Sequence, residues 1–118
     1  MVRGCTDADT IPKPPWSVRK QIYISHLSEA PASVRLVSCC DKIHNARAIL
    51  RDYEALGEAL WDRFKGGKSG TLWYYGELAN AFLRFGPAAP SDELNKIVVA
   101  LETRAGVSRG EARIPEGL

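Results

Sequence analysis

An acidic side chain, Asp41, stands in an otherwise apolar stretch of the sequence, between Cys40 and Ile43. A carboxylate with apolar neighbours protonates or destabilises the fold unless a counter-charge, several hydrogen-bond donors or a metal lies nearby. His44 and Asn45 follow at three and four residues, which places them beside Asp41 on one face of a helix. We therefore expect Asp41 to have such a partner and to be the residue of this chain most able to do chemistry.

Two other patterns could carry chemistry, and both are weaker. Cys40 and His44 are one helical turn apart, as zinc ligands can be, but no second Cys/His pair has metal-ligand spacing. The run Gly67-Lys68-Ser69 ends like a phosphate-binding loop, yet that motif needs an earlier glycine where this chain has Asp62. We interpret the cysteines as reduced thiols and the glycines at 66–67 as a hinge between helices.

The elements that would position these residues are all helical. Apolar spacing and Gly or Pro breaks predict an all-α fold of about five helices, over residues 16–27, 33–56, 58–64, 69–85 (or 71–85) and 91–105. We expect Ser33 and Ser91 to cap the helices that begin there. In the longest helix, the stripe Val34, Val37, Cys40 and Ile43 predicts a well-covered face. One helical domain over 1–106 and a polar, flexible tail over 107–118 follow.

Composition excludes several classes of protein. The 16 basic and 14 acidic residues are spread along the chain and leave a net charge of +2, so no basic stripe for a nucleic acid polymer is expected. No segment is apolar over the length of a membrane span, and the first residues lack the apolar core of a secretory signal. We expect a cytoplasmic protein without a membrane segment.

The residues around Asp41 point to a family. The string VRLVSCCDKIHN at 34–45 resembles the distal motif of HD-domain metal-dependent phosphohydrolases, above all the RelA/SpoT-like guanosine polyphosphate pyrophosphohydrolases, which read close to V-x-L-V-x-x-A-D-K-L-H-N. Arg19-Lys20 upstream and the runs at 47–53, 61–64 and 73–75 downstream also look familial. The resemblance covers residues 1 to 85 and corresponds to the C-terminal half of an HD-type helical bundle.

This resemblance implies a metal site and a nucleotide substrate. In the family a first His, a His-Asp pair and a distal Asp hold a divalent metal, and Asp41 resembles that distal Asp. Mn²⁺, or alternatively Fe²⁺ or Zn²⁺, suits such ligands, and it would polarise a phosphoryl oxygen and activate water. By resemblance, Asp41 is the catalytic and metal-binding residue, and the substrate-binding residues are Lys42, Asn45, Tyr74 and Tyr75. An ion pair between Asp41 and a buried Arg or Lys is the alternative without a metal.

The sequence departs from the family pattern in one important respect. The first His and the His-Asp pair belong to helices that precede Met1 in the relatives, and neither His26 nor His44 forms a His-Asp pair. One Asp cannot hold a catalytic metal alone, so we expect the chain by itself to bind no metal and to be inactive as a (p)ppGpp hydrolase. It would pair with a missing N-terminal half or self-associate. A non-catalytic helical interaction module is the alternative function.

Overall fold

Four α-helices and one 3-10 segment make up the part of the chain that the computed structural model describes, residues 15–86 and 88–114. They are α2 (Trp16–His26), α3 (Ala32–Leu56), η1 (Gly57–Arg63), α4 (Gly67–Phe85) and α5 (Ala88–Ala105). The predicted all-α class is confirmed, and these ranges contain no strand. The short third segment of the predicted set of about five is the 3-10 segment η1 rather than an α-helix.

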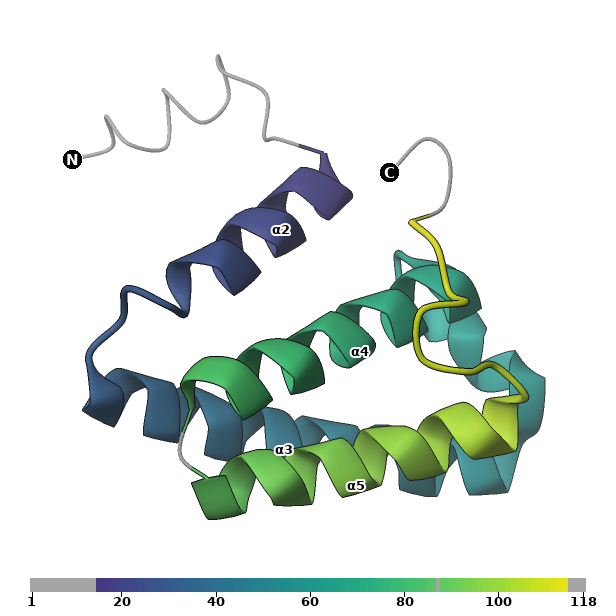
Figure 1. Cartoon of the computed structure of the whole chain (residues 1–118). Coiled ribbons are helices and arrows are strands. Elements are labelled where there is room, and N and C mark those ends of the chain that lie inside the picture. Colours follow the sequence, from purple (N-terminus) through teal and green to yellow (C-terminus); the bar gives the residue numbers. More distant parts are fainter. Residues whose placement is uncertain (1–14, 87, 115–118) are drawn as a thin grey trace, which may run out of the picture.

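Helices α3, α4 and α5 enclose the core, and α2 lies against α4 (Figure 1). The predicted stripe on α5 is confirmed, because Leu94, Ile97, Val98 and Leu101 are all buried. These side chains belong to one hydrophobic core with buried residues of α4 and η1, among them Leu60, Leu72, Leu78 and Phe82. No described helix is long and apolar enough to cross a membrane.

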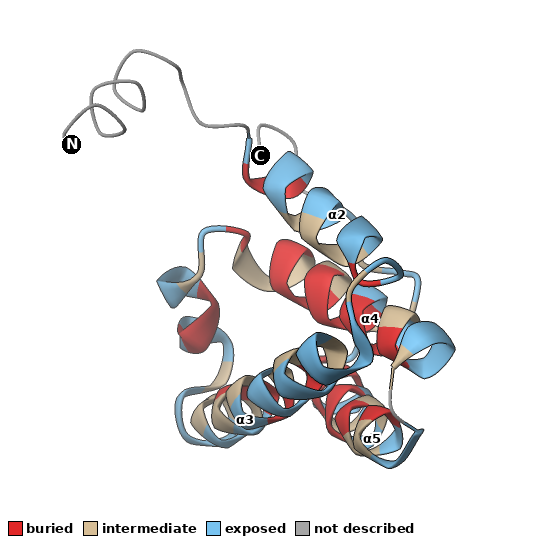
Figure 2. Cartoon of the chain, turned by 90° about the vertical axis from the view of Figure 1, so that its left-hand side faces the viewer, coloured by how far each residue is buried: buried red, intermediate tan, exposed pale blue. Residues whose placement is uncertain are grey.

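The buried face of α3 is only in part the predicted one: Ile43 of the predicted stripe is buried, whereas Cys40 is exposed. Cys39, Ile43, Ala46 and Ile49 are buried, whereas Val34 and Val37 are 49% and 68% exposed (Figure 2). The Cys39 thiol contacts Ser91 near the start of α5, and Glu54 pairs with Arg104 near its end. Helix α5 therefore covers α3 only from Cys39 onward, and the first turns of α3 extend past it with their apolar side chains in solvent.

Both predicted serine caps are wrong. Helix α3 begins at Ala32 with Pro31 in the N-cap position, and no side chain caps it. Ser91 lies inside α5, where its hydroxyl donates a 2.7 Å hydrogen bond to the Phe82 carbonyl of α4. A Cβ on Gly86 would lie 2.9 Å from this carbonyl, so the close α4–α5 turn requires glycine there.

Arg35 fixes the connection between α2 and α3. Its guanidinium donates hydrogen bonds to the carbonyls of Leu27 at 3.1 Å, Ser28 at 3.4 Å and Ala30 at 2.5 Å. The last carbonyls of a helix have no partner within the helix, and a cation there also interacts favourably with the helix dipole. Arg35 thereby holds the C-terminal end of α2 against the start of α3.

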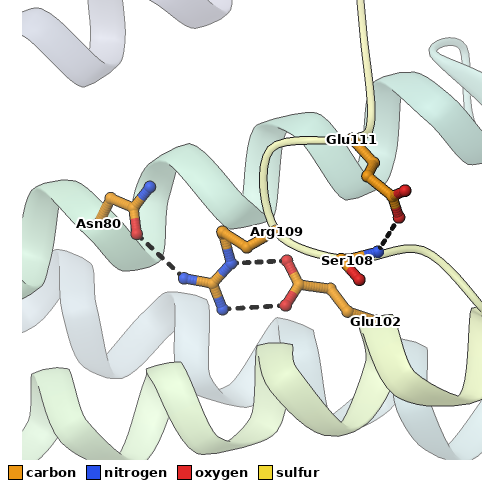
Figure 3. A network of polar contacts seen from close by, with 5 residues as sticks. All are labelled: Asn80, Glu102, Ser108, Arg109 and Glu111. Atoms are coloured by element: carbon orange, nitrogen blue, oxygen red, sulfur yellow. Dashed lines mark hydrogen bonds and ion pairs between the residues drawn. The ribbon is translucent and has the colours of Figure 1, made fainter.

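Arg109 attaches the segment after α5 to the helices (Figure 3). Its guanidinium donates two hydrogen bonds to the Glu102 carboxylate, at 2.6 and 3.0 Å, and one to the Asn80 amide oxygen at 3.0 Å. The Glu102 side chain is only 8% exposed, so this bidentate pair neutralises a buried charge. The sequence predicts a flexible tail over 107–118. Within this tail Arg109 makes the contacts described above, and residues 115–118 lie outside the described residues.

Candidate functional site

Asp41 lies on an exposed part of α3, which contradicts the apolar setting that the sequence predicted for it. The cause is the phase of the helix, because the buried face runs through Cys39 and Ile43 and leaves Asp41 at its edge. The Asn45 amide donates a long hydrogen bond, 3.5 Å, to the Asp41 carboxylate. Within the described ranges no basic group lies within 4.0 Å of this carboxylate, so the predicted ion pair with a buried Arg or Lys is not formed there.

Lys42 connects three helices at this position. Its ammonium nitrogen lies 5.0 Å from the ring centroid of Tyr23 on α2 and 5.8 Å from that of Tyr74 on α4. Both distances fall within the range of a cation–π interaction. The structure therefore brings Lys42 and Tyr74, two predicted substrate-binding residues from separate helices, next to each other.

Tyr74 and Tyr75 form the wall of this region on α4. Both are buried, and their ring centroids lie 5.5 Å apart in an edge-to-face arrangement. Burial raises the pKa of Tyr75 to about 12, and the charges of Asp41 and Tyr23 add to the effect. Burial, followed by Tyr23 and Tyr75, also raises the pKa of Tyr74. Both hydroxyls therefore stay protonated near neutral pH and are available as hydrogen-bond donors.

Two residues of α2 belong to the same cluster although sequence reasoning assigned them no role in the site. Lys20 places its ammonium nitrogen 4.6 Å from the Tyr74 ring centroid and 5.9 Å from that of Trp16. Burial lowers the pKa of Lys20, and the charges of Lys42 and Arg19 lower it further. The signal in the sequence was the spacing of Lys20 and Tyr23, which puts them on one face of α2. We call Lys20, Tyr23, Asp41, Lys42, Asn45, Tyr74 and Tyr75 the Asp41 cluster.

A small pocket of about 130 Å³ adjoins the Asp41 cluster. Its lining residues come from α2, from the hinge between η1 and α4, and from α4: Trp16, Lys20, Phe64, Lys65, Gly66, Thr71, Tyr74 and Tyr75. A Cβ on Gly66 would lie 2.7 Å from the Trp16 ring, so the close approach of the hinge to this ring requires glycine. The predicted hinge thus forms part of a pocket wall.

The described residues do not form a metal site by themselves. They contain no group of three His, Cys, Asp or Glu side chains that could hold an ion. The Cys40 thiol and the His44 ring are both exposed and line a shallow hollow between α3 and α5, whereas Cys39 is buried. Asp41 with Asn45 offers oxygen donors suited to a hard or borderline cation, but a catalytic ion needs about three protein ligands.

No family model matches the chain, and no curated protein or solved structure matches it either. The resemblance to HD-domain phosphohydrolases therefore depends on the motifs at 19–20, 34–53, 61–64 and 73–75 alone.

Proposed function

We propose that this chain forms part of an HD-type phosphohydrolase that acts on a phosphate or pyrophosphate group of a nucleotide such as (p)ppGpp. The observation that carries the proposal is the meeting of Asp41, Lys42, Tyr74 and Tyr75, which come from two distant segments that both look familial. An ammonium group and protonated hydroxyls can bind phosphate oxygens, and a carboxylate near them can bind a metal ion that does the same.

The exposure of Asp41 changes the reasons for assigning it a role as a metal ligand. Burial no longer explains why an acid stands at this position, so the metal-ligand role depends on the sequence likeness. An exposed carboxylate with no basic group of the described residues within 4.0 Å is, however, free to bind an ion. In the proposal, Asp41 provides one ligand to Mn²⁺, or alternatively Fe²⁺ or Zn²⁺, and a segment with the family's first His and His-Asp pair provides the others.

The residues of this chain would bind and orient the substrate. Lys42 would hold a phosphate oxygen by its charge, with its stem kept against the Tyr23 and Tyr74 rings. Asn45 would fix the rotamer of Asp41 through its amide, as a second residue around a metal often does for a ligand. A bound metal would supply an activated water, but a metal needs more ligands than the described residues offer, so we derive no step through it.

A second function, a helical interaction module, is favoured by one observation. Val34, Leu36 and Val37 at the start of α3 and Val18 and Ile22 on α2 are large apolar side chains that are each more than a third exposed. Exposed apolar groups that gather on one surface mark a partner site. A segment that completes the HD-type site could cover these exposed apolar side chains, and so could a second copy of the chain. The phosphohydrolase and the interaction module therefore differ in whether hydrolysis follows binding.

Reconstitution tests the proposal. The coding DNA around the gene is searched for an in-frame helical segment with a His and a His-Asp pair, and that segment is co-expressed with the chain. With Mn²⁺ and guanosine tetraphosphate, we expect pyrophosphate release that falls by about 100-fold in Asp41→Asn. Asp92→Asn changes an exposed acid of α5 and is the matched control, with a rate within about twofold of the parent. An Asp41→Asn complex as active as the control would contradict the proposal.

A further inference from the structure

The pocket beside the Asp41 cluster has the size of a small anion. Sites that hold drug-sized ligands occupy about 300 to 1,000 Å³, and this pocket of about 130 Å³ is too small for a nucleoside. A liquid water occupies about 30 Å³, so the space corresponds to about four waters. A single phosphate group, with one phosphorus and four oxygen atoms, has comparable bulk.

Three residues with hydroxyl groups line this pocket and are otherwise buried. Thr71, Tyr74 and Tyr75 are 4%, 7% and 8% exposed. None of their hydroxyls hydrogen-bonds to another residue within 15–86 or 88–114, and none is among the fully buried unpaired atoms of these ranges. The hydroxyl oxygens therefore reach the pocket surface and can hydrogen-bond to a polar ligand there. Because burial raises the pKa of both tyrosines, they would act as donors to that occupant.

The charge around the pocket indicates that the occupant is an anion. Lys20 and Lys65 line it, and in the described part of the chain neither ammonium group has a carboxylate within 4.0 Å. The charged groups that affect the pKa of Lys20 most are Lys42 and Arg19, and both are cationic. Partly buried like charges destabilise a fold unless an anion offsets them. Asp41 is the acid of this region, and it acts on Tyr75.

We propose that the pocket between α2 and the hinge before α4 binds a phosphate group, held by the Lys20 and Lys65 ammonium groups and the Thr71 hydroxyl. Tyr74 and Tyr75 line this pocket and also interact with Lys42 and Asp41, so a ligand with two phosphate groups could place one in the pocket and one beside Lys42. The inference deepens the proposed function and rests on it for the natural ligand, a nucleotide with more than one phosphate group. The phosphate chemistry itself depends only on residues of this chain.

Titration of the full chain with sodium phosphate, compared with sodium chloride at equal ionic strength, tests the pocket. Trp16 lines it, so binding is followed by tryptophan fluorescence. We expect saturable binding that weakens about tenfold in Lys20→Gln, in Lys65→Gln and in Thr71→Val, each of which removes one contact to the anion. Lys68→Gln is the matched control, because Lys68 lies next to the hinge, in the first turn of α4, but pairs with Glu58 at 3.1 Å. Its affinity should stay within about twofold.

Two outcomes would overturn the inference: phosphate produces no more change than chloride, or the three variants bind phosphate as the Lys68→Gln control does. Lys65 is exposed, so its substitution leaves the fold intact and keeps the test decisive even if another variant unfolds. Asp41→Asn separates this inference from the proposed function. It should bind phosphate at least as tightly as the parent, since it removes a negative charge, while hydrolysis by a reconstituted complex should be lost.

Discussion

The Lys42 ammonium nitrogen on α3 lies 5.8 Å from the centroid of the Tyr74 ring on α4, and Lys20 of α2 approaches the same ring at 4.6 Å. Three helices thus place two cations on one buried aromatic ring. Removal of the ring should free both ammonium groups.

Tyr75→Phe should alter stability at alkaline pH. Tyrosine ionises near pH 10 in the unfolded chain, whereas burial and Asp41 raise the pKa of folded Tyr75 to about 12. The folded state therefore keeps a proton that the unfolded state loses, and stability is complete below pH 10 and falls as pH rises towards 12. Urea unfolding should show that the free energy of unfolding falls less between about pH 9 and about pH 11 for Tyr75→Phe than for the parent. Equal losses would contradict the buried, neutral hydroxyl.

Arg35→Met should loosen α2. The three carbonyls that Arg35 binds would lose their donor, at a cost of about 1 to 2 kcal/mol of stability. Hydrogen exchange of the α2 amides should accelerate more than that of α5. Arg51→Met, which changes an exposed arginine of α3, the helix that also contains Arg35, should cost less than about 0.5 kcal/mol of stability. Uniform acceleration across all helices would indicate that Arg35 does not hold α2 specifically.

Arg109→Met should destabilise the fold by about 2 to 4 kcal/mol, because it leaves the buried Glu102 carboxylate without its cation. The double variant Glu102→Leu/Arg109→Met should recover part of this loss, since no unpaired charge remains. Arg104→Met breaks the half-exposed pair with Glu54 and should cost at most about 1 kcal/mol. Chemical denaturation measures all three, and similar effects of Arg109→Met and Arg104→Met would refute the role of Arg109.

The sequence predicted the helices well and their faces unevenly. Glycine and proline breaks located all the helical segments, and the single apolar stripe of α5 gave its buried face. Helix α3 carries apolar residues on more than one face, so Val34 and Val37 could be assigned to the core although α5 starts opposite Cys39. Which face is covered depends on where a neighbouring helix begins, and local spacing does not contain this information.

In the candidate site, too, contacts within one helix could be predicted from the sequence, whereas contacts between helices could not. The shared face of Asp41 and Asn45 follows from helical spacing, and the structure contains their hydrogen bond. The position of Lys20 beside Tyr74 depends on how α2 packs on α4, which Arg35 and the hinge at Gly66 control through long-range contacts. Sequence spacing within one helix could not predict that contact. The expectation that Asp41 is buried and needs a partner is wrong, because the covered face of α3 depends on how α5 packs against it.

Binding of guanosine tetraphosphate to the full chain, without metal, shows whether Lys42 and its neighbours hold a phosphate group. Lys42 would hold a phosphate group, so Lys42→Gln should weaken binding about tenfold in an equilibrium titration. Lys96→Gln changes an exposed lysine of α5 and should leave the affinity within about twofold. A phosphate group held by Lys42 requires this difference between the two variants; equal affinity in both, or no binding by the parent chain, would show that Lys42 does not hold one.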